Sequence, residues 1–142
     1  MITCTRRIQF CAGHRVMGHE NKCAHLHGHN YVAFFEAEGD LDNIGRVIDF
    51  SVLKERIGGW IDEYWDHGFI LFGDDYALSR LLNQFTAPLL KMYLLPANPT
   101  AENMAEYLLD EVCPAVLKDT GVKVTKVTLW ETENCKATAT LG

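Results

Sequence analysis

The chain has 142 residues, of which 48% are hydrophobic and 23% are charged, and its formal net charge is -6 at pH 7. This is enough apolar material for one sizeable core, so we expect a single domain over residues 1–142. The negative charge argues against nucleic acid and anionic membranes as partners, because both require a cationic face. No apolar run approaches the roughly 20 residues that span a bilayer. The first ten residues lack the apolar region of a signal peptide, and we expect a cytoplasmic protein.

The cysteines point to a reducing environment. There are five of them, an odd number, and no two are separated by only two residues. A disulfide framework and a cysteine-rich zinc module both need paired cysteines, so the sequence indicates neither. We therefore expect free thiols.

Two strands are predicted in the first third of the chain. Residues 2–12 are rich in Thr, Ile and Phe, and residues 29–38 (HNYVAFFEAE) continue from a group of histidines into a second strand. Residues 39–45 (GDLDNIG) have the composition of a turn.

A helix is predicted to follow, with Ser51 as its N-cap. The stretch 51–65 brings five large apolar residues near one helical face, although Gly58 and Gly59 weaken the helix. These five are Leu53, Ile57, Trp60, Ile61 and Trp65.

Residues 68–95 are apolar without a clear period, and we interpret them as a loop followed by a helix that breaks at Pro88. A better defined helix begins after Asn98-Pro99, with Thr100 as its cap and Asn103 at the position that a capping box gives to Glu or Gln. The apolar positions behind this cap are Met104, Leu108, Val112 and Val116.

The C-terminal part is predicted to form two strands. Residues 122–132 alternate with period two, and residues 135–141 form a short partner strand. The order of two strands, helices and two strands predicts an α+β fold, a four-stranded antiparallel sheet with helices on one face. Because such a sheet leaves its edges exposed, we expect a homo-oligomer in which neighbouring sheets join into a β-barrel.

Three of the six histidines lie within five residues, at His25, His27 and His29. On a strand, alternate side chains share a face, so two imidazoles separated by one residue can reach the same zinc ion. A catalytic zinc commonly has three protein ligands, and His14 is the natural third because its strand is expected to pair with residues 29–38. A cupin-type site also uses HxH, but it would need a Glu four or five residues later, where this chain has Ala33 and Phe34.

The residues around these histidines resemble the signature of the 6-pyruvoyl-tetrahydropterin synthase superfamily, in particular its 6-carboxy-tetrahydropterin synthase branch. The resemblance extends over nearly the whole chain. It is carried by Phe10-x-Ala12-x-His14, Cys23-x-x-x-His27-Gly28-His29, Val47-Ile48-Asp49-Phe50, Asp66-His67, Asn98-Pro99-Thr100-Ala101-Glu102 and Glu131-Thr132.

The resemblance implies a tunnelling fold (T-fold) assembled as a homohexamer of two trimers, with active sites at subunit interfaces. It also implies a zinc cofactor and a small pterin substrate. The implied zinc ligands are His14, His27 and His29; the implied catalytic residues are Cys23 as base, Asp66 and His67 as its relay, and Glu131 as the anchor of the pterin ring. Thr100 and Glu102 are implied to contact substrate as well. The chain departs from the family at Trp65, where Leu is common, and in residues 68–95, an atypical insertion.

The implied reaction converts 7,8-dihydroneopterin triphosphate to 6-carboxy-5,6,7,8-tetrahydropterin, with release of acetaldehyde and triphosphate, as in the queuosine pathway. Such a lyase needs a Lewis acid and groups that move protons, and the residue types suit both needs.

Three alternatives stay open at this point. A 6-pyruvoyl-tetrahydropterin synthase would eliminate triphosphate alone, although the three residues between Cys23 and His27 favour the carboxy branch. A variant that feeds folate synthesis would be expected to have Glu at position 23. A non-catalytic zinc-stabilised module would have no need of Cys23, Asp66, His67 and Glu131 together.

Overall fold

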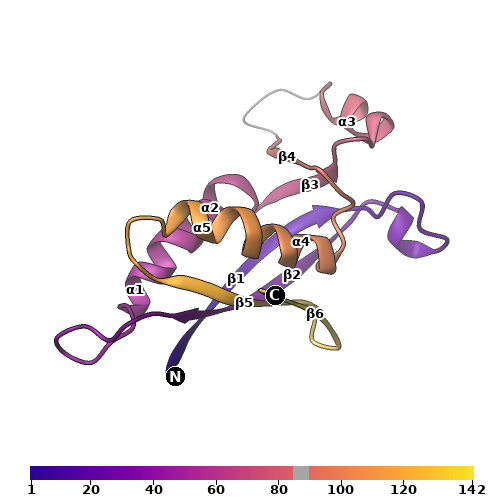
Figure 1. Cartoon of the computed structure of the whole chain (residues 1–142). Coiled ribbons are helices and arrows are strands. Elements are labelled where there is room, and N and C mark those ends of the chain that lie inside the picture. The colour runs from indigo at the N-terminus through magenta and orange to yellow at the C-terminus, as the bar shows by residue number, and fades with distance from the viewer. Residues whose placement is uncertain (85–89) are drawn as a thin grey trace.

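The structure, a computed structural model, describes residues 1–84 and 90–142. Within these ranges six strands form one mixed sheet in the order β4-β3-β1-β2-β5-β6, with helices lying along it (Figure 1). The strands are β1 (Thr3–His14), β2 (His27–Glu38), β3 (Gly68–Phe72), β4 (Met92–Leu95), β5 (Lys123–Thr132) and β6 (Cys135–Thr140). The α+β class is confirmed, while the predicted count of four strands is too low.

Two long helical segments cover one face of this sheet (Figure 1). Each contains a π-helical turn between two α-helical parts. The first consists of α1 (Phe50–Leu53), η2 (Lys54–Gly58) and α2 (Gly59–Tyr64), and the second of α4 (Ala101–Tyr107), η3 (Leu108–Val112) and α5 (Cys113–Val116). No helix in the described ranges is long and apolar enough to cross a membrane.

Alternation along β1 and β2 produces the core. Phe10 pairs with Tyr31 across the two antiparallel strands, and their stacked rings lie 4.9 Å apart. Both rings point toward the helices, as do the buried side chains two residues away on either strand. His14 and His27 are the last pair of this ladder. Each is four residues from the inward-facing ring on its own strand, Phe10 or Tyr31, so both side chains point to the same inward face.

The predicted apolar face of the first helix is confirmed in its buried residues, since Leu53, Ile57, Ile61 and Trp65 are fully buried in the core. Its cap differs from the prediction: the Asp49 carboxylate accepts a hydrogen bond from the Ser51 N–H, so Asp49 and not Ser51 is the N-cap. The cap of the later helix is as predicted, because Thr100 accepts from the Asn103 N–H.

Residues 68–95 differ most from their prediction. They contain two strands, β3 parallel to β1 and β4 parallel to β3, joined through α3 (Tyr76–Leu82). The predicted break at Pro88 lies outside the described residues. Both strands are continuous apolar runs, Phe69 to Phe72 on β3 and Met92 to Leu95 on β4, so period-two alternation could not identify them.

The helix α3 also departs from the predicted one-sided arrangement. Its Leu78 and Leu82 pack against Leu71, in a cluster separate from the main core. Ile70, the neighbour of Leu71 on β3, belongs instead to the main core. Since neighbouring side chains on a strand point to opposite faces, α3 covers the face that the other helices leave open.

Candidate active site

The three histidines of the predicted metal site lie together at the end of the core. His14 and His27 are register partners at the ends of β1 and β2, and their Nε2 atoms are 3.2 Å apart. His29 faces the same side two residues along, with its ring 5.1 Å from that of His14 and 4.8 Å from that of His27. One ligating nitrogen from each histidine lies within 4.8 Å of the others.

Backbone carbonyls orient two of these rings. His14 Nδ1 lies 2.7 Å from the carbonyl oxygen of Pro99, and His27 Nδ1 lies 2.6 Å from that of His25. A carbonyl can only accept, so each Nδ1 donates its proton and the lone pair of each Nε2 is left facing the cluster. Burial lowers the pKa of His14 to about 4, further helped by the neighbouring histidines and despite the Pro99 hydrogen bond. His14 is therefore neutral at pH 7, the form that binds metal.

The third histidine shows that this cluster fits a metal ion. His29 Nε2 is buried and has no hydrogen-bond partner among the described residues. A buried polar atom without a partner costs about 1–3 kcal/mol. Three imidazole nitrogens at these separations suit zinc, which binds such nitrogens at about 2.0–2.1 Å and satisfies the unpaired atom.

A carboxylate lies beside the histidines. Glu131 lies on β5 two residues after the buried Leu129, where the pairing with β6 is irregular, and its carboxylate faces the histidines. Its Oε1 is 3.5 Å from His29 Nε2, and its Oε2 is 3.9 Å from His14 Nε2. The Glu131 side chain is 23% exposed, so it can contact both the cluster and a molecule that enters from solvent.

Asp66 and His67 form a second polar group with an unpredicted member. The Asp66 carboxylate accepts a hydrogen bond from His67 Nδ1 at 2.8 Å and another from the Cys11 backbone N–H at 2.9 Å. The Cys11 thiol lies 3.7 Å from His67 Nε2. Burial raises the pKa of Asp66, but these hydrogen bonds outweigh that effect and the pKa lies below its usual value. Asp66 is therefore a firmly ionised partner for the ring.

Cys23 lies elsewhere, in the short 3₁₀ helix η1 (Lys22–Ala24) between β1 and β2. Its carbonyl accepts a hydrogen bond from the Val16 N–H at 2.7 Å, which closes the loop. Among the described residues no hydrogen bond joins Cys23 to Asp66 or His67. In the part of the chain that the structure describes, the cysteine whose thiol lies within 4.8 Å of Asp66 and His67 is Cys11 and not Cys23.

Thr100 and Glu102 lie at the start of α4. Thr100 uses its hydroxyl to cap this helix, and it follows Pro99, whose carbonyl holds His14. Glu102 is exposed on the first turn. The predicted segment is thus adjacent to the histidine cluster through its backbone, while within the described ranges the carboxylate that pairs with the cluster is that of Glu131 and not Glu102.

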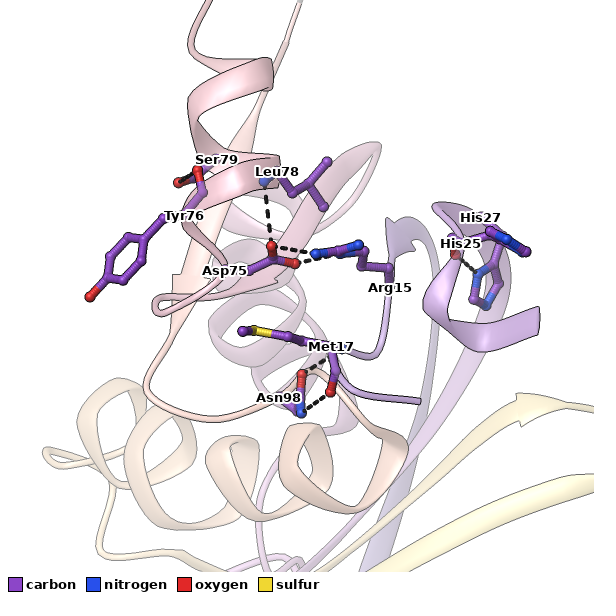
Figure 2. A network of polar contacts seen from close by, with 9 residues as sticks. All are labelled: Arg15, Met17, His25, His27, Asp75, Tyr76, Leu78, Ser79 and Asn98. Atoms are coloured by element: carbon purple, nitrogen blue, oxygen red, sulfur yellow. Dashed lines mark hydrogen bonds and ion pairs between the residues drawn. The ribbon is translucent and has the colours of Figure 1, made fainter. Parts of the chain in front are cut away.

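Two further contacts attach the loop after His14 to the rest of the molecule (Figure 2). Arg15 donates two hydrogen bonds of 2.6 Å to the buried Asp75 at the start of α3. The Asn98 side chain pairs with both backbone groups of Met17, at 2.9 Å each. Sequence reasoning missed these residues and Cys11, because no local pattern relates positions 55 to 81 residues apart.

Comparison with known proteins agrees with this geometry. The family described as 6-pyruvoyl tetrahydropterin synthase matches residues 3–141. A protein from Rickettsia bellii named 6-carboxy-5,6,7,8-tetrahydropterin synthase is 44% identical over 136 residues, which covers 95% of this chain and 97% of that protein. A Haemophilus influenzae protein of the same name is 30% identical, with coverage of 93% and 94%.

Solved structures share the fold over the whole chain. A protein from Wolinella succinogenes, described as uncharacterized, superposes with a TM-score of 0.84 at 26% identity and covers 99% of this chain and 98% of its own. The Caenorhabditis elegans 6-pyruvoyl tetrahydropterin synthase has a TM-score of 0.69 at 24% identity, with coverage of 99% and 96%, and supports the fold alone. The chain is therefore an enzyme of the 6-pyruvoyl tetrahydropterin synthase family, related to members named 6-carboxy-5,6,7,8-tetrahydropterin synthase.

Proposed function

We propose that this protein is a zinc-dependent lyase that converts 7,8-dihydroneopterin triphosphate and one water molecule to 6-carboxy-5,6,7,8-tetrahydropterin, acetaldehyde and triphosphate. The names of its relatives support this reaction. The observation that carries the proposal is the position of Glu131 within 3.5–3.9 Å of two histidines of the cluster. A carboxylate there can hold a nitrogen-rich ring next to a metal.

His14, His27 and His29 would hold the zinc ion. When bound, zinc supplies Lewis acidity toward the oxygens of the substrate side chain, which makes neighbouring C–H bonds easier to deprotonate. The Pro99 and His25 carbonyls keep the His14 and His27 rings in the tautomer that this role requires.

The protein side chains would orient the substrate and move its protons. Glu131 accepts paired hydrogen bonds from the N–H groups of the aminopyrimidine ring. His67 has its Nδ1 held by Asp66 and 77% of its side chain exposed, so its Nε2, beside the Cys11 thiol, can exchange a proton with substrate. Cys23 acts as the base on the other side of the substrate.

These separate roles of Cys23 and the Asp66–His67 pair favour an assembly in which two chains complete one active site. Among the described residues, Cys11 and not Cys23 is the cysteine grouped with Asp66 and His67, and the His67 side chain is 77% exposed. The sheet face opposite α1 and α4 also carries an apolar hollow of about 420 Å³, lined chiefly by Val32, Phe34 and Trp130. Burial of this hollow against other sheets supports a homohexamer of two trimers that enclose a β-barrel.

A second candidate function is the 6-pyruvoyl-tetrahydropterin synthase reaction, since the family as a whole carries that description. The two candidates differ in their products. Incubation of the zinc-loaded protein with dihydroneopterin triphosphate, followed by mass analysis, should give 6-carboxy-tetrahydropterin and acetaldehyde in equal amounts. A pyruvoyl product that keeps all side-chain carbons would assign the chain to the second function, and unchanged substrate would refute both. We further propose a role in queuosine synthesis in the cytoplasm, which the product assay does not test.

A further inference from the structure

A second group of metal-ligand side chains lies away from the three histidines. The Cys11 thiol, the Asp66 carboxylate and the His67 ring each offer one ligand atom, and these three atoms lie within 4.8 Å of one another. Cys11 lies between the inward-facing Phe10 and Ala12 on β1, so its side chain points to the opposite face of the sheet. The two groups therefore lie on different faces.

The separations in this second group are close to those of a zinc site. Cys11 Sγ lies 3.8 Å from Asp66 Oδ1 and 3.9 Å from His67 Nδ1, and Nδ1 lies 2.8 Å from Asp66 Oδ2. Tetrahedral zinc with ordinary bond lengths separates its sulfur, nitrogen and oxygen ligands by about 3.3–3.6 Å. The Cys11 thiol is nearly equidistant from the two ring nitrogens of His67, at 3.9 Å and 3.7 Å, so zinc binding requires the exposed His67 ring to rotate and the three side chains to shift slightly.

The backbone holds the three side chains in place. The Cys11 N–H donates to Asp66 Oδ1, and the His67 N–H donates to the Cys11 carbonyl at 2.7 Å. His67 has a φ of 61°, a left-handed conformation that costs a residue other than glycine about 1–2 kcal/mol. The contact with β1 maintains this conformation and directs the ring toward Cys11.

Open space adjoins the group. A hollow of about 360 Å³ lies over the ends of β1, β2 and β3 and is lined by Cys11, His67 and the paired glycines Gly13 and Gly28. Because neither glycine has a side chain, water can approach the group there and supply the remaining ligand of a tetrahedral ion.

We propose that Cys11, Asp66 and His67 form a second zinc site on each chain. Zinc takes the thiolate, one carboxylate oxygen and His67 Nδ1; the thiol proton leaves to solvent, and the His67 proton moves from Nδ1 to Nε2. This site binds more weakly than the three-histidine site, since zinc must replace an existing hydrogen bond between Asp66 and His67. Zinc is a borderline-soft ion and therefore accepts the thiolate of Cys11 as a ligand.

Occupation of this site has a consequence that rests on the proposed function. Zinc on Asp66 and His67 breaks the pair that would exchange protons with substrate. Surplus zinc therefore inhibits turnover, while one equivalent per chain supports it. The binding of the second ion itself does not depend on the proposed function and is tested without substrate.

Titration of the metal-free protein with Co²⁺ tests the site, because cobalt replaces zinc and a thiolate ligand adds a charge-transfer absorption that histidines alone do not produce. The expected result is two equivalents per chain, with the thiolate absorption developing during the second. The Cys11→Ser variant should bind one equivalent of Co²⁺ per chain without this absorption. The His67→Asn variant should give the same result, and its asparagine tolerates the left-handed backbone at this position. His27→Ala should lose the first equivalent and keep the absorption.

Two matched cysteine variants make the assignment specific. Cys135→Ser removes an exposed thiol at the start of β6 and should leave both equivalents unchanged. If Cys23→Ser and not Cys11→Ser removes the absorption, the thiolate belongs to Cys23 and the proposal is wrong. A single equivalent in the unmodified protein, up to millimolar free Co²⁺, would also overturn it. Loss of inhibition by surplus zinc in Cys11→Ser links the site to turnover, and a lack of turnover in every variant would count only against the proposed function.

Discussion

Arg15 forms a bidentate ion pair with Asp75, with both hydrogen bonds at 2.6 Å (Figure 2). Arg15 follows the proposed zinc ligand His14, and Asp75 is the buried N-cap of α3. The contact thus attaches α3 to the loop that carries Cys23. We infer that residues 68–95 stabilise the site.

Asp75→Asn should lower the free energy of unfolding by about 2–3 kcal/mol. The amide can still cap α3, but it leaves the Arg15 charge without its partner, and the loss of one member of a buried pair is costly. The partial exposure of Arg15, at 30%, keeps the figure below that of a fully buried pair. Urea unfolding measures the change, and the exposed neighbour Asp74→Asn serves as control and should shift stability by less than about 0.5 kcal/mol.

The same pair predicts a pH dependence. The hydrogen bonds from Arg15 hold the pKa of Asp75 below its usual value of 3.8, although burial opposes this. A lowered pKa in the folded state contributes stability that is complete above the unfolded value and is lost as pH falls through the folded value. The difference in unfolding free energy between the unmodified protein and Asp75→Asn should therefore be constant from pH 7 to 5 and shrink below about pH 4. A difference that persists unchanged at pH 2.5 would contradict the ion pair as its source.

Removal of any one of the three clustered histidines should release zinc. Bound zinc stabilises only the folded state. Free zinc at a hundredfold excess over its Kd should therefore raise the free energy of unfolding by about 2.7 kcal/mol, and chelation should lower the melting temperature. His14→Ala, His27→Ala and His29→Ala should each lose most metal and most of this sensitivity to chelator. His25→Ala should retain both, since its side chain is exposed and only its carbonyl contacts His27. Full zinc content in the first three variants would refute the site.

Glu131→Gln separates two roles of its carboxylate. As an anchor of the pterin ring it should be dispensable for zinc but needed for turnover, with a loss on the order of 10²-fold in kcat/KM, since each hydrogen bond to a charged group is worth about 1.5–3 kcal/mol. Zinc content and steady-state kinetics measured together decide the matter. Loss of zinc would identify Glu131 as a metal ligand instead. Glu133→Gln, an exposed change at the β5–β6 turn, is the control.

Cys23→Ala should keep zinc and fold but lower turnover by about 10²–10⁴-fold, the usual effect of removing a general base. Single-turnover kinetics on the zinc-loaded variant measure this step, with Cys135→Ala as the matched control. Near-normal turnover would mean that another group is the base, and Cys11→Ala would then be the variant to measure.

Two glycines should respond to alanine in opposite ways. A Cβ on Gly13 would lie 2.6 Å from the Phe69 ring, whereas one on Gly59 would meet nothing within 4 Å. Gly13→Ala should destabilise by about 1–3 kcal/mol through overpacking. Gly59→Ala should stabilise by about 0.5–1 kcal/mol, because Gly59 is in a helix and alanine loses less entropy there. Thermal unfolding of both variants checks the contrast.

The amino-acid sequence alone determined much of the fold and one half of the site. Period-two alternation predicted β5, the Thr-, Ile- and Phe-rich composition of residues 2–12 predicted β1, and β2 and β6 were predicted as the segments after the histidine group and after the 122–132 strand. The same alternation predicted that His27 and His29 share a face and that His14 lies opposite them. Local patterns of this kind depend only on neighbours in the chain, which is why they could be read directly.

Tertiary structure decided what depends on distant residues. The strands β3 and β4 could not be recognised, because each is a short continuous apolar run without alternation and the pairing of β3 with β1 leaves no local mark. A helix was predicted within residues 68–95, but its position at α3 and the face that it covers were not. The contacts of Cys11 with Asp66 and of Arg15 with Asp75 join residues 55 and 60 positions apart. The packing of β3 beside β1 brings Cys11 and Asp66 together. The docking of α3 on the opposite face of the sheet brings Arg15 and Asp75 together. Both contacts arise from the paths of separate elements, and no spacing along the chain predicts them.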